Sequence, residues 1–300
     1  VSGIIHPSVE LLLQSVQTSD YDIRSSVMAS LSNILVRDVP EIAQYSGEIY
    51  KAIFTILSDE IAPEETENDI NEIEDNEEDD DMENLFTGNQ SQINSITNAF
   101  LLIKNIFKLC KYLIPNETIV MQLLQSCYSY MDSLTEDLTV AATLAATYIH
   151  IKFTGIDLTE FFNLILRHLD EEDGATNVAT CFKVLSRFLE RDIQLPEGLI
   201  QEAVNYAKKG LKGKLECQDE DTDNSEPALL TLSMHIYRFL ATVATKIPQV
   251  FPINEFIDHR KHTQSDFELS QLIGVLRQYY LNYRQQIGNL QMKKIIQIII

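Results

Sequence analysis

Apolar residues recur along most of the chain at the three- and four-residue spacing of one face of an α-helix. The clearest example is a long helix whose apolar face is formed by Ile96, Phe100, Ile103, Phe107 and Cys110. We find no segment with the sustained apolar and polar alternation that is typical of a β-strand. The sequence therefore predicts an all-α protein.

The predicted helices form six successive pairs separated by polar turns. Their ranges are 7–16 and 23–35, 42–57 and 93–113, 118–134 and 138–153, 158–169 and 178–189, 199–215 and 229–247, and 253–259 and 267–283. Where no insertion intervenes, second helices begin about forty residues apart, which is roughly the period of two-helix solenoid repeats. We predict an α-solenoid of about six helix pairs, a single array over residues 1–300. Its apolar end at 295–300 suggests a fragment of a longer array, because terminal repeats normally carry a polar outer face.

Two acidic segments interrupt this pattern. Residues 59–83 contain fifteen acidic residues and no Lys or Arg, and they lie between the two helices of the second pair. Like charges repel and such a segment has little apolar area to bury, so we predict a disordered acidic insert over residues 58–92. A second, shorter acidic insert is predicted at residues 216–227.

Negative charge is concentrated in these inserts. The formal net charge is -22, yet outside the two inserts 24 acidic residues face 23 basic ones. Such a distribution favours recognition of basic protein segments, whereas direct nucleic-acid binding is disfavoured because the basic residues form no long patch. The candidate partner-binding residues of the acidic loop are Glu72, Glu74, Asp75, Glu77, Glu78, Asp79, Asp80, Asp81 and Glu83. The alternative is a solvated linker without a partner.

The sequence carries no recognisable catalytic, metal-binding or cofactor-binding motif. His259 and His262 have a suitable spacing, but no Cys or carboxylate pattern completes a metal site. We predict that the protein is not an enzyme and binds no cofactor. The four cysteines are expected to be buried thiols of a reducing compartment. We also see no signal peptide and no apolar run of the roughly 18 residues that a membrane span needs, so we expect a soluble intracellular protein.

The segment at residues 20–31, which reads DYDIRSSVMASL, resembles the turn and second helix of a HEAT repeat. In that family, an Asp in the turn and an Arg early in the second helix form a ladder between neighbouring repeats. Asp20 or Asp22 and Arg24 match these positions, so the resemblance implies a structural role for them. We also expect Asp22 to cap the helix. Later units match only in their helical periodicity.

Among HEAT-repeat proteins, the chain resembles the importin-β (karyopherin-β) nuclear transport receptors, in particular the importin-4 and importin-5 branch, which carry an acidic loop between the helices of one repeat. The resemblance implies a protein-transport receptor of the cytoplasm and nucleus that binds basic cargo segments or histones and is regulated by the GTPase Ran. The alternative is a structural scaffold, either a phosphatase regulatory subunit or a condensin- or cohesin-type HEAT protein. No recognisable Ran-binding segment precedes the repeats, which leaves this alternative open.

Overall fold

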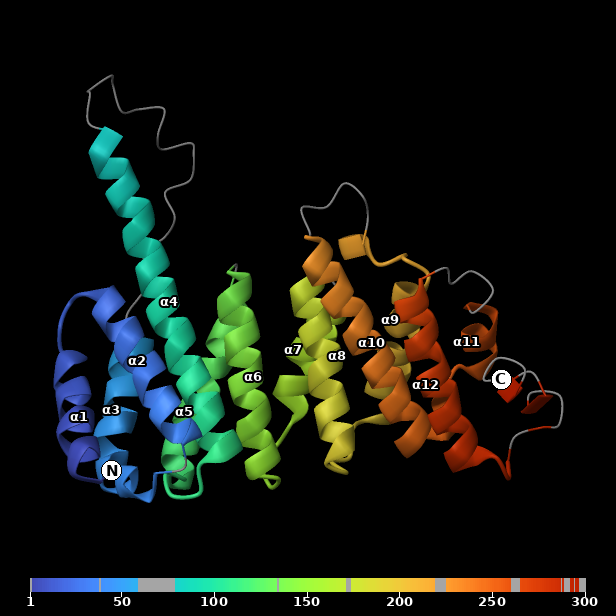
Figure 1. Ribbon diagram of the computed structural model, residues 1–300, viewed down its shortest axis with the longest axis horizontal. Coiled ribbons are helices and arrows are strands. Elements are labelled where there is room, and N and C mark those ends of the chain that lie inside the picture. Colours follow the sequence, from blue (N-terminus) through green and yellow to red (C-terminus); the bar gives the residue numbers. More distant parts are fainter. Residues whose placement is uncertain are drawn as a thin grey trace. The chain divides into compact units, whose positions relative to one another are not determined.

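The computed structural model shows a helical protein (Figure 1). It describes residues 2–37, 39–58, 79–133, 135–170, 174–218, 225–259, 265–286, 288, 292–293 and 295–296. All regular structure in these ranges is helical, which confirms the all-α prediction. The chain divides into two compact units, Val1–Lys152 and Phe153–Ile300, and each is described separately below.

Unit 1 is built from three helix pairs. Its elements are α1 (Ser2–Ser15), α2 (Tyr21–Val36), the 3-10 helix η1 (Pro40–Tyr45), α3 (Ser46–Leu57), α4 (Asp79–Leu109), α5 (Glu117–Met131) and α6 (Glu136–Lys152). The second helices α2, α4 and α6 form one layer in which α4 packs extensively on both neighbours (Figure 1). The first helices α1, α3 and α5 each contact the second helix of their own pair.

The long helix α4 is the centre of unit 1. Its predicted apolar face is buried, and Phe100 and Ile103 are fully inaccessible to solvent. Burying a large apolar side chain contributes ~1.5–3 kcal/mol, so this face is a major source of stability. The neighbouring face of α4 carries two asparagines that contact α2. Asn98 Nδ2 donates to Ser25 Oγ at 2.9 Å, and Asn105 Nδ2 donates to Ser32 Oγ at 2.5 Å.

The first turns of α4 differ from the sequence prediction. The helix begins at Asp79, whereas we expected the insert to continue to residue 92 and the helix to start at Ile93. The stretch 79–92 is therefore helical and not a loop. A physical reason lies in the sequence, because aspartates at positions 79–81 occupy the end of the helix where its dipole favours negative charge. Residues 59–78 lie outside the described part of the chain.

The first turn of α2 also differs in one respect. Asp20 is the N-cap, and its Oδ1 accepts hydrogen bonds from the backbone N–H groups of Asp22 (2.9 Å) and Ile23 (3.1 Å). The expectation that Asp22 caps the helix was therefore wrong. Asp22 lies in the first turn, where the helix dipole also favours a carboxylate. Arg24 Nε donates to the Val16 carbonyl at 3.1 Å, which ties the start of α2 to the end of α1. The ladder between repeats stays a prediction.

Unit 2 repeats the same arrangement. Its elements are α7 (Thr159–Asp170), α8 (Ala175–Glu190), α9 (Glu197–Leu211), the 3-10 helix η3 (Glu216–Gln218), α10 (Glu226–Lys246), the 3-10 helix η4 (Pro248–Val250), α11 (Ile253–His259) and α12 (Asp266–Tyr283). The second helix α10 packs extensively on α8 and α12, while the first helices α7 and α9 meet only slightly. Gly210 of α9 allows a close approach to α10, because a Cβ there would lie 2.4 Å from the Ile236 Cδ1 atom.

Aromatic side chains occupy the core of unit 2, both between its two layers and within the layer of second helices. Phe188 of α8 lies between two rings of α7, with centroid distances of 5.7 Å to Phe161 and 5.6 Å to Phe162. Phe182 of α8 lies 5.4 Å from Phe239 of α10. These contacts contribute to the packing of α7 on α8 and of α8 on α10, since aromatic pairs stabilise beyond the area they bury.

The predictions about the cysteines and about membrane-spanning segments had different outcomes. All four cysteines are free thiols and all are buried, as predicted. We expected no apolar run long enough for a membrane span, whereas α10 has the length and apolar composition of a helix that could cross a membrane. Its apolar side chains pack against α8 and α12, as those of a core helix do, and Leu232, Leu240 and Val243 are fully buried.

Candidate functional site

A groove runs between the first helices α7 and α9 of unit 2. Because α8 and α10 pack closely while α7 and α9 hardly touch, the first-helix layer is left open between them. Two adjoining hollows of about 450 Å³ and 440 Å³ occupy this space and share Leu166. We call them together the α7–α9 groove. One end is polar and the other is largely apolar.

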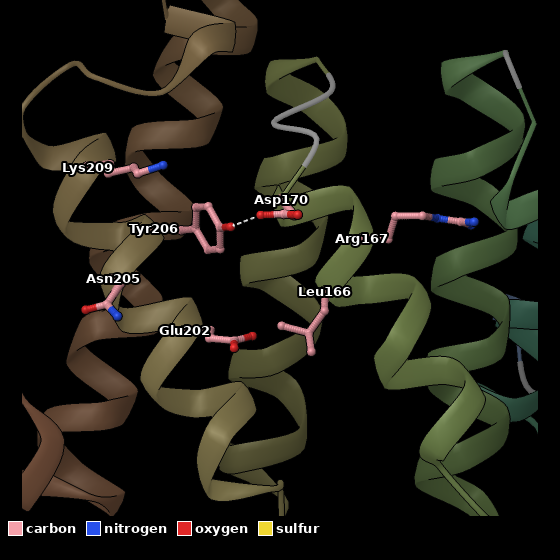
Figure 2. Close-up of a pocket in the computed structure, with 7 residues that line it drawn as sticks. All are labelled: Leu166, Arg167, Asp170, Glu202, Asn205, Tyr206 and Lys209. Atoms are coloured by element: carbon pink, nitrogen blue, oxygen red, sulfur yellow. Dashed lines mark hydrogen bonds between the residues drawn. The ribbon is translucent and has the colours of Figure 1, made fainter.

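The polar end is organised by Asp170 and Tyr206 (Figure 2). Asp170 is the last residue of α7, where the helix dipole disfavours negative charge. The Tyr206 hydroxyl of α9 donates a hydrogen bond to Asp170 Oδ1, which compensates for that position. The ammonium group of Lys209, one turn later on α9, lies 4.9 Å from the centroid of the Tyr206 ring.

Charge at this end is balanced among the described lining residues, because Asp170 and Glu202 are accompanied by Arg167 and Lys209. Glu202 and Asn205 extend the α9 wall and are exposed, and Arg167 points away from the pair of Asp170 and Tyr206 (Figure 2). Two carboxylates, Asp170 and Glu202, therefore face the hollow together with the ammonium group of Lys209. The two carboxylates are the groups at this end that would accept hydrogen bonds from a cationic group of a partner.

The other end offers apolar contact. It is lined on the α7 side by Leu158, Phe162 and Leu166 and on the α9 side by Leu195, Pro196 and Leu199. The start of α7 is fixed at this end because Asp157 Oδ1 accepts from Thr159 N at 3.0 Å and from Thr159 Oγ1 at 2.7 Å. Apolar walls with a few placed polar groups are typical of binding sites. The groove is therefore a candidate docking site for a peptide.

The sequence-predicted site residues are not among the residues that line this groove. Glu72, Glu74, Asp75, Glu77 and Glu78 lie outside the described residues. The remaining four candidates, Asp79, Asp80, Asp81 and Glu83, belong to the first turns of α4 in unit 1, and the groove belongs to unit 2.

Sequence reasoning missed the groove altogether. Asp170 and Tyr206 lie 36 positions apart and belong to different helix pairs, so no local motif joins them. A partial signal was present, because exposed polar residues at positions 202, 205 and 209 share one face of a predicted helix.

Metal-binding side chains form no second candidate site in the described part of the chain. Among the residues that the structure describes, no three His, Cys, Asp or Glu side chains are grouped so that they could hold a metal ion. Comparison with known proteins adds no family either: no protein-family model matches the chain, and no curated protein matches it.

Proposed function

We propose that this chain is a protein-binding α-solenoid segment of a nuclear transport receptor of the HEAT-repeat class. It recognises basic segments of cargo proteins or histones, under regulation by the GTPase Ran, and works in the cytoplasm and nucleus. Each acidic insert supplies negative charge that attracts a basic partner, and the helix pairs are the frame that carries the inserts.

The repeated pairing of helices supports the solenoid part of the proposal. In each unit, a layer of second helices packs side by side, and the first helices α1, α3, α5, α7 and α9 each contact the second helix of their own pair. The parallel direction of α2 and α4 follows from their two hydrogen-bonded pairs, which have the same sequence separation of 73 positions. Repetition of one helix pair in this manner is the basis of helical repeat proteins.

The observation that carries the functional part is the position of the acidic segment 59–83. It lies between α3, a first helix, and the body of α4, a second helix, and carries fifteen of the 45 acidic residues of the protein. A dense local charge accelerates encounter with an oppositely charged partner, even where it forms no fixed contact. A basic segment is the partner that this charge attracts.

The α7–α9 groove gives such a segment a place to bind. A Lys or Arg side chain fits beside Asp170 and Glu202, and a neighbouring apolar side chain fits against Leu166. Exposed ion pairs contribute only ~0–1 kcal/mol each, so the apolar end supplies much of the affinity. The acidic segment then raises the association rate constant of the partner, and the contacts in the groove lower its dissociation rate constant.

Equilibrium binding of a labelled peptide rich in Lys, Arg and Leu tests this proposal. We expect the Asp170→Asn and Glu202→Gln double variant to bind about tenfold more weakly, because two charge-assisted contacts are lost. A matched double variant in unit 1, Glu41→Gln with Glu48→Gln, should bind like the unaltered protein. Equal affinity of both double variants would argue against the groove.

A second experiment distinguishes a nuclear transport receptor from a structural scaffold. The receptor proposal predicts that Ran binds the full-length protein in its GTP form and that this binding displaces the basic peptide. If Ran in either nucleotide state leaves the protein and its bound peptide unaffected, a structural scaffold becomes the better assignment.

A further inference from the structure

One face of α12 carries a stripe of cationic and apolar side chains. Arg277, Tyr280, Leu281 and Arg284 occupy positions i, i+3, i+4 and i+7, which lie on the same side of an α-helix. Arg284 follows the last residue of α12, and its backbone keeps a helical conformation with φ -51° and ψ -31°. Leu281 is 52% exposed, both arginines are exposed and Tyr280 is half-buried. We call these four residues the α12 stripe.

The opposite face of α12 belongs to the core of unit 2. Its members have the same spacing and are buried: Leu272, Val275, Leu276 and Tyr279. The Tyr279 ring packs on that of Phe251 with a centroid distance of 4.8 Å, which helps to fix the rotation of α12 about its axis. A third face, which includes Gln271 and Gln278, lines a hollow beside α10. The α12 stripe therefore lies outside both the core face and the face beside α10.

Neither arginine of the α12 stripe has a carboxylate partner among the described residues. Arg277 and Arg284 form no hydrogen bond and no ion pair there, and the ion pairs seen in unit 2 involve other cations. The sequence explains this, because residues 269–300 contain four basic residues and no Asp or Glu. In a chain with 45 acidic residues, this segment is a local excess of positive charge.

The cations of the neighbouring helix α10 are paired, in contrast to those of the stripe. Arg238 Nη2 lies 2.8 Å from Glu190 Oε1, and Lys246 Nζ lies 2.5 Å from Asp192 Oδ1. Both carboxylates belong to α8 or to the turn that follows it, so cations of one second helix pair with carboxylates of the second helix before it. Helix α10 offers α12 no such carboxylate, because residues 227–246 contain no Asp or Glu. The stripe therefore suits a partner that brings its own carboxylates.

We propose that the α12 stripe is the docking surface for an acidic amphipathic helix of a partner protein. Arg277 and Arg284 lie about 10 Å apart along the helix axis, since each residue adds about 1.5 Å. Two carboxylates seven positions apart on the partner helix match this distance, and each can accept two hydrogen bonds from one guanidinium group. An apolar side chain between those carboxylates packs against Leu281, as in other complexes that recognise an amphipathic helix.

Charge and apolar content both favour this occupant over others. A basic helix would meet like charge at Arg277 and Arg284, which destabilises a complex. Proteins that bind single-stranded nucleic acid combine cations with exposed aromatic rings on which the bases stack. In the α12 stripe the exposed apolar side chain is the aliphatic Leu281, and the ring of Tyr280 is half-buried. The stripe therefore has the charge but not the stacking surface that nucleic acid needs.

Fluorescence anisotropy with the full chain tests the proposal. The probe is a labelled helix-forming peptide with Leu along one face and two Glu residues, seven positions apart, beside it. A buffer with about 150 mM salt screens the charges elsewhere on the chain. We expect the Arg277→Glu and Arg284→Glu double variant to bind about tenfold more weakly. The matched control, Arg37→Glu with Lys51→Glu in unit 1, makes the same change of charge at two exposed residues and should bind like the unaltered protein.

A charge swap makes the test specific to the two arginines. The Arg277→Glu and Arg284→Glu double variant should bind a second peptide, in which Lys replaces both Glu residues, more tightly than the unaltered protein does. Leu281→Ala should weaken binding of the acidic peptide about threefold, because it removes apolar contact area. The same truncation at another exposed leucine, Leu11→Ala on α1, should leave the affinity unchanged.

Three results would overturn this proposal. The first is equal affinity of the Arg277→Glu and Arg284→Glu double variant and its control for the acidic peptide. The second is displacement of that peptide by an oligothymidylate at lower concentration than by the unlabelled peptide. The third is self-association of the unaltered chain that this double variant alone loses, which would assign the surface to a second copy. The Asp170→Asn and Glu202→Gln double variant should keep full affinity for the acidic peptide, so the α7–α9 groove and the α12 stripe are tested independently.

Discussion

Asn98 of α4 donates its side-chain amide to the hydroxyl of Ser25 on α2 at 2.9 Å, and the same pairing recurs seven residues later between Asn105 and Ser32. Seven residues correspond to about two helical turns, so both pairs lie on the same edge of the two helices. The contacts fix the register of α2 against α4, although α3 and the acidic segment separate these helices in the sequence.

Removing either member of the first pair should lower the stability of unit 1. We expect Asn98→Ala and Ser25→Ala each to reduce the free energy of unfolding by about 0.5–1.5 kcal/mol, because a part-buried hydrogen bond is lost. Urea unfolding monitored by circular dichroism measures this. The double variant should cost less than the sum of the single variants, since both remove the same bond.

Asn94 provides the matched control for this pair. It is exposed on the same helix, where it accepts a hydrogen bond from Gln90. We expect Asn94→Ala to change the free energy of unfolding by less than about 0.5 kcal/mol. Strictly additive costs of Asn98→Ala and Ser25→Ala would contradict the pairing.

The helix pairs could be predicted because apolar spacing reports directly on the buried face, as the burial of Phe100 and Ile103 shows. The start of α4 could not be predicted from the sequence. The dense negative charge of this segment favours a loop, whereas the helix dipole favours acidic residues in the first turn of a helix. The cap was ambiguous for a similar reason, since Asp20 and Asp22 are two positions apart and both suit a helix start. The α7–α9 groove depends on how far two first helices separate, which no local pattern encodes.

Phe188 is predicted to be a major determinant of the stability of unit 2. Its ring packs on Phe161 and Phe162 and is fully buried, so Phe188→Ala removes contacts between α7 and α8 and leaves a cavity. We expect a loss of about 3–5 kcal/mol in urea unfolding. Leu281→Ala, at a side chain that is 52% exposed on α12, should have little effect. Similar losses in the free energy of unfolding for the two substitutions would show that Phe188 is not a major part of the core of unit 2.

His235 should make the protein sensitive to mild acid. Its pKa in the folded state is about 4, below the ordinary value of 6.5, so the unfolded chain takes up a proton first as the pH falls. Folding stability therefore decreases between about pH 6.5 and pH 4. His235→Gln should lose less stability than the unaltered protein when urea unfolding is compared at both ends of this window.

The charges around His235 offer a direct spectroscopic check. Lys183→Gln removes one of the cations that lower this pKa, so the imidazole should titrate at higher pH in an NMR experiment. A titration midpoint that does not move would mean that Lys183 lies too far from the imidazole to act on it.

The cysteines should be unreactive in the folded protein. Burial raises the pKa of Cys181 to about 12 and raises that of Cys127 as well, so little thiolate is present at neutral pH. Because the thiolate is the reactive form, labelling by an aromatic disulfide should require unfolding. Denatured protein should react at all four thiols. Rapid reaction of Cys127 or Cys181 in the native protein would contradict the described packing.

The central claim is that the acidic segment 59–83 recruits basic partners electrostatically. Stopped-flow association of a Lys- and Arg-rich peptide tests it most directly, with the full chain and a variant lacking residues 64–83 compared over a range of salt concentrations. We predict that the association rate constant of the full chain falls steeply with salt, while that of the variant is lower and nearly independent of salt. Equal rate constants and equal salt dependence for the two proteins would contradict the claim.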